Sequence, residues 1–234
     1  SEQIVNCAAK MRWSLGGEVD VPIVYRTAYG GGVGAGMHHS QCFDHWFAGV
    51  PGLKVVLPST PSDAKGLLKA AVRDNDPVLF LEHKFLYKRL QGPVPDEEYT
   101  VPIGKGDIKR EGEDVTIIAL SAMVQQALEA AELLAQKDIQ AEVLDPRTIL
   151  PLDEDLILQS VAKTGKAVIV HEAPVIGGFG GEIAAVLADK GIDYLEAPVK
   201  RVGAPFCPVP SSPEMEQFYL PNAEKIIKAV LEIV

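Results

Sequence analysis

The sequence predicts an α/β protein made of two domains, each built around a mainly parallel sheet. In the first half, the apolar runs Leu53–Leu57 and Val78–Leu81 flank a segment with helical spacing. Such a strand–helix–strand unit is right-handed, and its two strands are parallel. In the second half, short apolar runs alternate with amphipathic segments at even spacing, which is typical of a further α/β domain. Residues 91–113 lie between the halves and are rich in proline, glycine and mixed charges, so we expect a linker there.

Size, charge and cysteine content exclude several classes of protein. The chain has 234 residues, a net charge of −10 and 47% hydrophobic residues, which suits a pair of folded domains. The sequence has no basic stripe to neutralise phosphates, so nucleic acid is not an expected partner. No apolar run is long enough to cross a bilayer, and membrane insertion is not expected. Cys7, Cys42 and Cys207 are too scattered for a disulfide framework, which favours a reducing compartment, the cytoplasm or an organelle matrix.

Local signals define the elements of the first half. Apolar residues at helical spacing from Ile4 to Trp13 predict an amphipathic helix, which a pair of glycines then ends. Val21–Tyr25 is expected to be the first strand. A later helix is expected to begin at Thr60, because a hydroxyl cap, a proline and a carboxylate follow one another there.

The second half is predicted to hold four strands and four helices. The strands are expected to begin near Val115, Ala141, Ala167 and Asp193. The helices are expected at Met123–Lys137, Asp153–Lys163, Gly181–Lys190 and Pro221–Val234. The change in composition puts the domain boundary near residue 100, so the predicted domains are 1–100 and 101–234.

A glycine-rich loop is the strongest candidate for a functional segment. Five of the seven residues from Gly30 to Gly36 are glycine, which permits positive φ and the close approach of another molecule. His38 and His39 follow at once, and histidine titrates near neutral pH. The glycines do not directly open a helix and lack an acidic ribose partner, which disfavours a dinucleotide site. A loop that orders around a cofactor or partner and a plain flexible turn both stay open.

The side chains behind this loop admit three interpretations. His38, Cys42 and His45 would share one face of a helix and could bind zinc, although no second cysteine pair accompanies them. His39 with Cys42 or Ser40 could form a base and nucleophile pair, but no carboxylate to orient the base is identifiable. A purely structural role for His39 is the third interpretation, and spacing alone does not separate catalysis from structure.

Two further polar groups lie at the ends of predicted elements. Asp74 and Asp76 follow a helix end with free carbonyls at and after Ala71, which suits a hard cation. The alternative is a turn in which these carboxylates cap backbone amides. His171 and Glu172 stand at the carboxyl end of a predicted strand, where open α/β sheets bind ligands, or else in a tight strand-to-helix turn.

Six motifs spread over the whole chain resemble a single family. They are HSQCF at 39–43, PGLKVVLPSTPSDAKGLL at 51–68, RDNDPV at 73–78, LEHKFLY at 81–87, DPRTILPLD at 145–153 and HEAPVIGGFGGEI at 171–183. Together they resemble the β subunit of the thiamine-diphosphate-dependent decarboxylating component of 2-oxo acid dehydrogenase complexes.

The resemblance implies an architecture, a reaction and a set of partners. The fold would combine a truncated pyrimidine-binding domain of the thiamine-diphosphate type with a transketolase C-terminal-like domain. The family works as an α2β2 heterotetramer, in which the α subunit holds the diphosphate and Mg²⁺ while β covers the aminopyrimidine. A small 2-oxo acid would lose CO2, and its acyl group would pass to a lipoyl group on the core acyltransferase. The compartment would be the cytoplasm, or the mitochondrial matrix in a eukaryote.

The resemblance also assigns roles to particular residues. His39 matches the active-site histidine of the family's HSQ motif, with an expected role in guiding protons and stabilising intermediates during acyl transfer. A structural K⁺ ion would be bound, mostly through carbonyls, by Ile23, Ala71, Val72, Asp74 and Asp76. Asp76 departs mildly from the asparagine often found there, and His38 stands where relatives often have glutamine or tyrosine. The glutamate that contacts the pyrimidine ring would precede Ser1, so no cofactor-binding residue is expected here, and the chain is expected to be part of a longer subunit or to be completed by another polypeptide.

Three alternatives accompany this reading. An acetoin dehydrogenase β subunit shares the same motifs. The chain could instead be an interaction module that folds and docks without a complete cofactor site. A free transketolase or synthase fits poorly, because the sequence contains no motif for a diphosphate and its metal.

Overall fold

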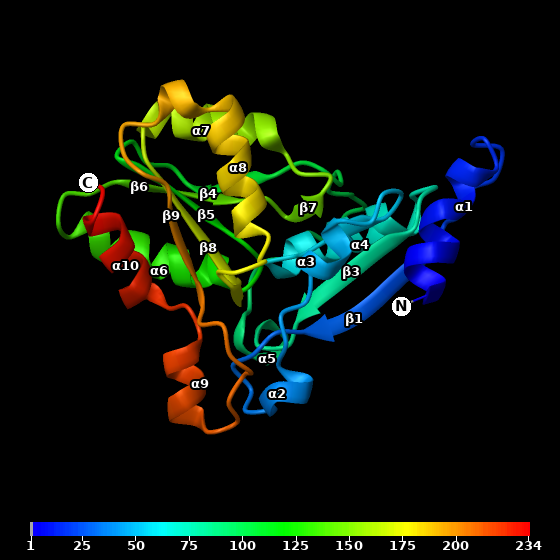
Figure 1. Ribbon diagram of the computed structural model, residues 1–234, viewed down its shortest axis with the longest axis horizontal. Helices are drawn as coiled ribbons and strands as arrows, with labels where there is room; N and C mark the ends of the chain where they lie inside the picture. The colour runs from blue at the N-terminus through cyan, green and yellow to red at the C-terminus, as the bar shows by residue number, and fades with distance from the viewer. Residues whose placement is uncertain (1) are drawn as a thin grey trace.

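The computed structural model describes residues 2–234 and contains two sheets, each at the centre of its own domain (Figure 1). The first sheet has the strand order β1-β3-β2-β7, and the second has the order β4-β6-β5-β8-β9. The first comprises β1 (Val24–Tyr29), β2 (Lys54–Val56), β3 (Val78–His83) and β7 (Thr148–Leu150). The second comprises β4 (Asp107–Arg110), β5 (Val115–Ala119), β6 (Ala141–Asp145), β8 (Ala167–Pro174) and β9 (Lys200–Ala204). All neighbouring strands are parallel except for the edge strands β7 and β4.

Helices pack on both faces of the second sheet, and other helices lie around the first sheet. The helices are α1 (Ala9–Ser14), α2 (Gly36–His39), α3 (His45–Ala48), α4 (Pro61–Val72), α5 (Leu86–Arg89), α6 (Met123–Ala135), α7 (Glu154–Thr164), α8 (Gly180–Lys190), α9 (Pro213–Tyr219) and α10 (Ala223–Leu231). The π-helical turn Gln3–Ala8 runs into α1, at the far end of the first domain (Figure 1). In the second domain α6 and α10 pack on one face of the sheet, and α7 and α8 pack on the other.

Helix α4 forms as its sequence predicts. The backbone N–H of Asp63 donates to the Thr60 hydroxyl at 3.1 Å, and Pro61 occupies the first turn. Leu67 and Ala71 are buried against Val78 and other residues of the first sheet, so one stripe of the helix supplies core and the other meets solvent.

The prediction of a strand that begins near Asp193 is wrong. Residues Ile192–Tyr194 form a short 3₁₀ turn, and the edge strand β9 begins only at Lys200, which pairs with Val168. Pro198, just before it, has no N–H to donate to a ladder. The first strand also begins later than predicted, at Val24, because the N–H of Val21 bonds outside the sheet.

Two elements join the domains in ways that the periodicity of the sequence does not predict. Strand β7 lies in the chain between β6 and β8 of the second sheet, yet it pairs antiparallel with β2 of the first. Helix α9 hangs below the second domain on the same side as α2 (Figure 1). Its start at Ser212 and Pro213 is an ordinary helix signal, but the helix is only seven residues long.

A buried ionic network crosses the seam between the domains. Arg147, beside β7, lies 2.9 Å (Nε to Oδ1) from Asp63 of α4, and Lys109 of β4 lies 2.7 Å (Nζ to Oδ2) from the same carboxylate. Ser59 of the first domain donates to Asp145 of the second at 2.5 Å. These contacts fix the two sheets relative to one another.

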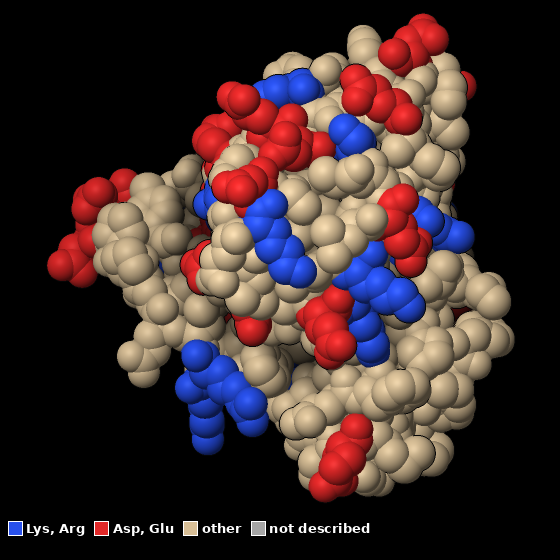
Figure 2. All heavy atoms as spheres, turned by 90° about the vertical axis from the view of Figure 1, so that its left-hand side faces the viewer, with Lys and Arg blue, Asp and Glu red and all other residues tan. Residues whose placement is uncertain are grey.

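The outer surface of the second domain carries both signs of charge. Acidic and basic side chains are interspersed on the face that Figure 2 shows. None of the helices in residues 2–234 combines the length and the apolar character that a bilayer crossing requires.

Candidate functional site

The glycine-rich segment is an ordered loop that leaves β1 and returns to its own starting point. The N–H of Gly30 donates to the carbonyl of Gln41 at 3.0 Å and closes the loop at its neck. Gly30 and Gly32 have positive φ and lie against the side chains of β3 and the following turn. A Cβ on Gly30 would lie 2.0 Å from His83 Nε2, and one on Gly32 would lie 2.7 Å from the Phe85 ring. Glycine is therefore required by both conformation and packing at these two positions.

Two carboxylates of the second domain hold this loop through its backbone. The N–H of Gly31 donates to Glu172 at 2.7 Å. Those of Gly32 and Gly34 donate to the two oxygens of Glu216, at 3.0 and 2.9 Å. Both carboxylates are buried, so the amides replace the water that the acids give up.

The buried pair of His83 and Glu172 continues this arrangement into the first sheet. The ring nitrogen Nε2 of His83 lies 2.7 Å from Glu172 Oε2. Burial alone would raise the pKa of Glu172, but attraction to His83, the hydrogen bond from His83 and the Gly31 amide together lower it below its ordinary value. Glu172 therefore serves as a charged acceptor between the carboxyl ends of β3 and β8.

A cavity of about 570 Å³ lies between the domains, below the loop. Its lining includes Gly31–Gly34, His83, Phe85, Arg89, Glu172 and Glu216. Two carboxylates and one guanidinium face it, which is a poor donor set for a diphosphate. The residues around this cavity thus do not fit the diphosphate of a thiamine cofactor.

His39 is the last residue of α2, and its side chain is exposed. The backbone around it is fixed, because the N–H of Ser40 donates to Gly36 O at 2.9 Å and the Gln41 side chain donates to Met37 O at 2.8 Å. His39 lines no wall of the cavity just described. It stands on the outer rim of the loop, where a second molecule can reach it.

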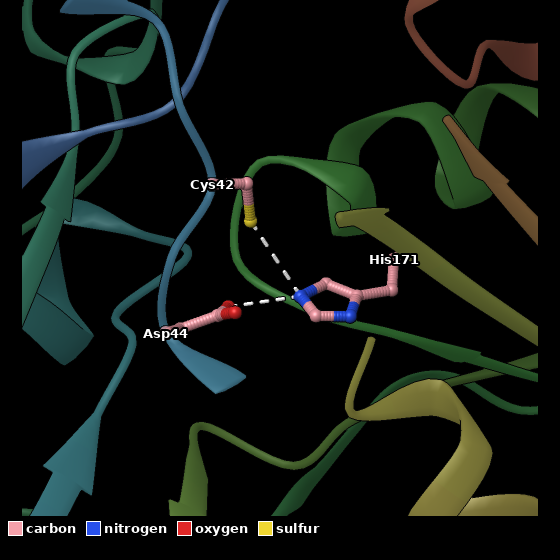
Figure 3. Close-up of side chains that lie close together, drawn as sticks. All are labelled: Cys42, Asp44 and His171. Carbon is pink, nitrogen blue, oxygen red and sulfur yellow. Dashed lines mark hydrogen bonds and ion pairs between the residues drawn. The ribbon is translucent and has the colours of Figure 1, made fainter. Parts of the chain in front are cut away.

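The structure separates the three residues behind the loop that were considered as a zinc site. Cys42 lies between α2 and α3, so the helical face that would join it to His38 and His45 does not form. Instead, Cys42 Sγ lies 3.6 Å from His171 Nε2, and Asp44 Oδ2 lies 2.9 Å from the same nitrogen (Figure 3). Burial raises the pKa of the Cys42 thiol well above its ordinary value, and the charge of Asp44 raises it further, which disfavours a thiolate nucleophile.

The five residues predicted to bind a cation come together at the start of β1 and β3. The carbonyl of Ile23 accepts from Val78 N at 2.9 Å, and that of Ala71 accepts from Asp74 N at 3.3 Å. Lys54 Nζ lies 2.6 Å from Asp74 Oδ2 and 3.2 Å from Asp76 Oδ2. The remaining carbonyl capacity of this helix end suits a hard cation, whereas the two carboxylates already pair with Lys54 and, for Asp76, with Arg12 at 2.8 Å. Asp74 also accepts the N–H of Asp76 at 2.9 Å, so the capping turn considered as the alternative is present.

Glu216 is the residue of this region that sequence reasoning missed. It lies on α9, a short helix without an assigned position in the predicted fold, and acidic residues are common in this chain. The only local signal is the Ser-Pro-Glu helix start at residues 212–214, which says nothing about the partner of Glu216.

Family comparisons place this architecture in a known class. Residues 3–89 match the transketolase pyrimidine-binding domain, and residues 104–226 match the transketolase C-terminal domain. The fold is also similar to that of a split-gene transketolase solved as an inactive beta4 tetramer, with a TM-score of 0.79 and 25% identity. That match covers 99% of this chain and 70% of the other. The protein is thus a transketolase-like α/β protein, and the predicted fold class is confirmed.

Curated relatives narrow the class to one family. The chain is 51% identical over 232 residues to the β subunit of acetoin:2,6-dichlorophenolindophenol oxidoreductase of Bacillus subtilis, covering 99% of this chain and 68% of the relative. It is 47% identical to the β subunit of 2-oxoisovalerate dehydrogenase of that organism, covering 99% and 71%. It is 46% identical to the β subunit of its pyruvate dehydrogenase E1 component, covering 96% and 69%. The chain belongs to the family of β subunits of the decarboxylating component of thiamine-diphosphate-dependent 2-oxo acid dehydrogenase complexes.

Proposed function

We propose that this chain contributes the acyl-transfer histidine, His39, to a 2-oxo acid dehydrogenase whose cofactor is held mainly by other polypeptide. The observation that carries the proposal is the exposure of His39 on a loop that buried carboxylates of the other domain hold in place. Thiamine diphosphate, when bound, supplies the carbanion chemistry that lets a 2-oxo acid lose CO2. The poor match between the cavity lining and a diphosphate supports an α subunit as the holder of the diphosphate and Mg²⁺.

The role proposed for His39 is the movement of a proton during transfer to a lipoyl group. In that transfer the disulfide of the dithiolane ring breaks and one sulfur forms a bond to the acyl carbon. The second sulfur leaves with the electron pair and takes up a proton. An exposed imidazole is suited to give that proton and to stabilise developing charge, because histidine is the side chain that most often acts as a general acid or base.

The test uses the whole β subunit assembled with its α subunit. Reduction of the dye 2,6-dichlorophenolindophenol by the enzyme reports decarboxylation, and acylation of a lipoyl domain reports transfer. We expect His39→Ala to lower acylation by about 100-fold or more while dye reduction persists, since general acid–base groups contribute roughly 10²–10⁴ in rate. His38→Ala removes the neighbouring exposed imidazole and should change neither rate. Normal acylation by His39→Ala would contradict the proposal.

The partners and compartment follow from the same proposal. The lipoyl acyltransferase core is the acceptor, and an α subunit completes an α2β2 heterotetramer. Relatives include bacterial proteins and mitochondrial ones, such as a rice pyruvate dehydrogenase β subunit, which supports the cytoplasm or the mitochondrial matrix as the location. A K⁺ ion would lie at the carbonyls of Ile23, Ala71 and Val72, beside Asp74 and Asp76.

Acetoin dehydrogenation is the second candidate function, favoured by the 51% identity to an acetoin oxidoreductase β subunit. Dye reduction by the assembled enzyme with pyruvate, 2-oxoisovalerate and acetoin separates the candidates. If acetoin supports dye reduction and the two 2-oxo acids do not, the enzyme is an acetoin dehydrogenase and the 2-oxo acid assignment is wrong.

The interaction-module alternative is tested with the 234-residue chain alone. Calorimetry with thiamine diphosphate and Mg²⁺ should show no tight binding, because the cavity lining lacks a cationic diphosphate seat. Tight binding would show that this chain holds a complete cofactor site by itself.

A further inference from the structure

Glu216 is a buried acid whose contacts go to the backbone of the loop that carries His39. Its two oxygens accept the N–H groups of Gly32 and Gly34, at 3.0 and 2.9 Å. The side chain is almost fully buried and lies on α9, more than 180 residues away in the chain. A carboxylate that accepts two backbone N–H groups forms strong, directional bonds and fixes the spacing between the two donors.

In the outer half of the loop, the backbone N–H groups of Gly32 and Gly34 both bond to Glu216. The glycines of the loop have the largest conformational freedom of any residue, and Val33 between them is exposed. Glu172 holds the amide of Gly31 but is shared with His83. Glu216 is therefore the main anchor of the loop's outer half.

The geometry transmits this anchoring to His39. The loop is closed at its neck by the bond from Gly30 to Gln41, so its two halves cannot move independently. Gly36, which begins the one-turn helix ending at His39, packs on the segment before α9: a Cβ there would lie 3.2 Å from that of Ser211. The same piece of the second domain thus supports the loop at Gly32–Gly34 and at Gly36.

We propose that Glu216, assisted by Glu172, is a positioning residue that holds the glycine loop and so sets the location of His39 for acyl transfer, an inference that rests on the proposed function of His39. In this proposal Glu216 acts through the loop backbone rather than on a reacting atom. Its contribution is to hold the imidazole in one place, so that the lipoyl group meets a preorganised donor.

The test compares Glu216→Ala and Glu216→Gln with the matched control Glu214→Ala in the assembled enzyme. Glu214 lies on the same helix but is exposed, and its side chain accepts a hydrogen bond from the nearby Ser212 hydroxyl rather than from the loop. Hydrogen exchange of the peptide covering residues 30–37, followed by mass spectrometry, measures loop order directly. Dye reduction and lipoyl acylation are measured on the same samples, together with the melting temperature.

We expect Glu216→Ala to accelerate exchange of the loop and to lower acylation by about 10- to 100-fold, since small misplacements of a catalytic group have effects of this size. Dye reduction should stay near the level of the control. Glu216→Gln keeps one acceptor oxygen, so its exchange rate and its acylation rate should lie between those of Glu216→Ala and those of the Glu214→Ala control. A merely structural role would instead lower both rates together with the melting temperature, and that result would overturn the proposal.

Two further outcomes distinguish this proposal from the function of His39. Unchanged exchange of residues 30–37 in Glu216→Ala would overturn the anchoring itself, whatever His39 does. Faster exchange with acylation equal to the control, while His39→Ala abolishes acylation, would overturn the positioning role but leave the proposed function intact. Normal acylation by His39→Ala would contradict both the positioning role of Glu216 and the proposed function of His39.

Discussion

The imidazole of His171 lies 2.9 Å (Nε2 to Oδ2) from the carboxylate of Asp44, and this contact joins β8 of the second domain to the first turn of α3 (Figure 3). Asp44 is completely buried and also accepts the N–H of His45 at 2.7 Å. Burial alone would raise the pKa of Asp44, but attraction to His171 and hydrogen bonds from His171 and His45 hold it well below its ordinary value. The seam behind the glycine loop therefore depends on a buried charge with a single imidazole partner across the domains.

Substituting His171→Ala should destabilise the protein by up to about 3–5 kcal/mol at pH 7, because it removes the cross-domain partner of a buried carboxylate and leaves only the contacts with His45. The pKa of Asp44 is lower in the folded state, so its stabilising contribution is present above about pH 4 and is lost as pH falls through the folded value. In His171→Ala, burial would raise the pKa of Asp44. Lowering the pH should therefore narrow the difference in free energy of unfolding between this variant and the unsubstituted protein. Urea unfolding between pH 4 and pH 8 measures this. His38→Ala, which removes an exposed imidazole, should change stability little at either pH.

Asp145 should make the opposite contribution. Burial raises its pKa to about 6, against the opposing attraction of Lys109 and the hydrogen bond from Ser59. Because the folded pKa lies above the ordinary value, the contribution to stability is present below about pH 4 and is lost as pH rises to about 6. In Asp145→Asn the single amide oxygen can still accept the backbone N–H of Arg147, and the amide NH2 can donate to the Ser59 hydroxyl in place of the bond that Ser59 now donates. The substitution should therefore raise stability at pH 7.5 by up to about 3 kcal/mol, at 1.36 kcal/mol per pKa unit.

The matched control for this substitution is Asp107→Asn, in the same ionic network but partly exposed. Asp107 pairs with Lys109 and Arg147 at 2.8 and 2.7 Å. Replacing Asp107 by the neutral asparagine should not raise the free energy of unfolding at pH 7.5, because the Asp107 carboxylate is partly exposed to solvent. Equal gains from both variants would show that the net charge of the network, rather than the burial of Asp145, controls stability.

The order of the main elements could be predicted from the sequence, because each is encoded by its own period and caps. Helix α4, with Thr60 as its cap, is the clearest case. The three-residue strand β7 could not be predicted, because a run so short carries no period, and the domain boundary near residue 100 stays a prediction. The contacts that build the site were also out of reach. Glu216 meets Gly34 across 182 positions, and nothing local marks which of the 32 acidic residues it would be.

Potassium should stabilise the protein more than other monovalent cations, if the carbonyl site at Ile23, Ala71 and Val72 binds it. A ligand present at 100 times its dissociation constant adds about 2.7 kcal/mol to stability. Thermal melting in KCl, compared with choline chloride at equal ionic strength, tests the site without any activity assay. Arg12 and Lys54 already pair with the Asp76 carboxylate, so Asp76→Asn should leave the effect of potassium in place. Identical melting curves in both salts would refute the cation assignment.

Gly30→Ala should destabilise the protein more than its backbone conformation alone explains. Gly30 has φ of +84° and Gly177 has φ of +76°, so an alanine at either position meets similar left-handed strain of about 1–2 kcal/mol. The two sites differ in the space around an added side chain: a Cβ at Gly30 would lie 2.0 Å from His83 Nε2, whereas a Cβ at Gly177 would meet no atom of the other described residues within 4 Å. The first variant must therefore displace a buried imidazole paired with Glu172, and overpacking of this kind adds about 1–3 kcal/mol. Urea unfolding of both variants gives the difference, and hydrogen exchange of residues 30–37 shows whether the loop loosens with it. Equal destabilisation by the two substitutions would mean that the loop can shift away from His83 at no cost, and that the close contact between them does not define its position.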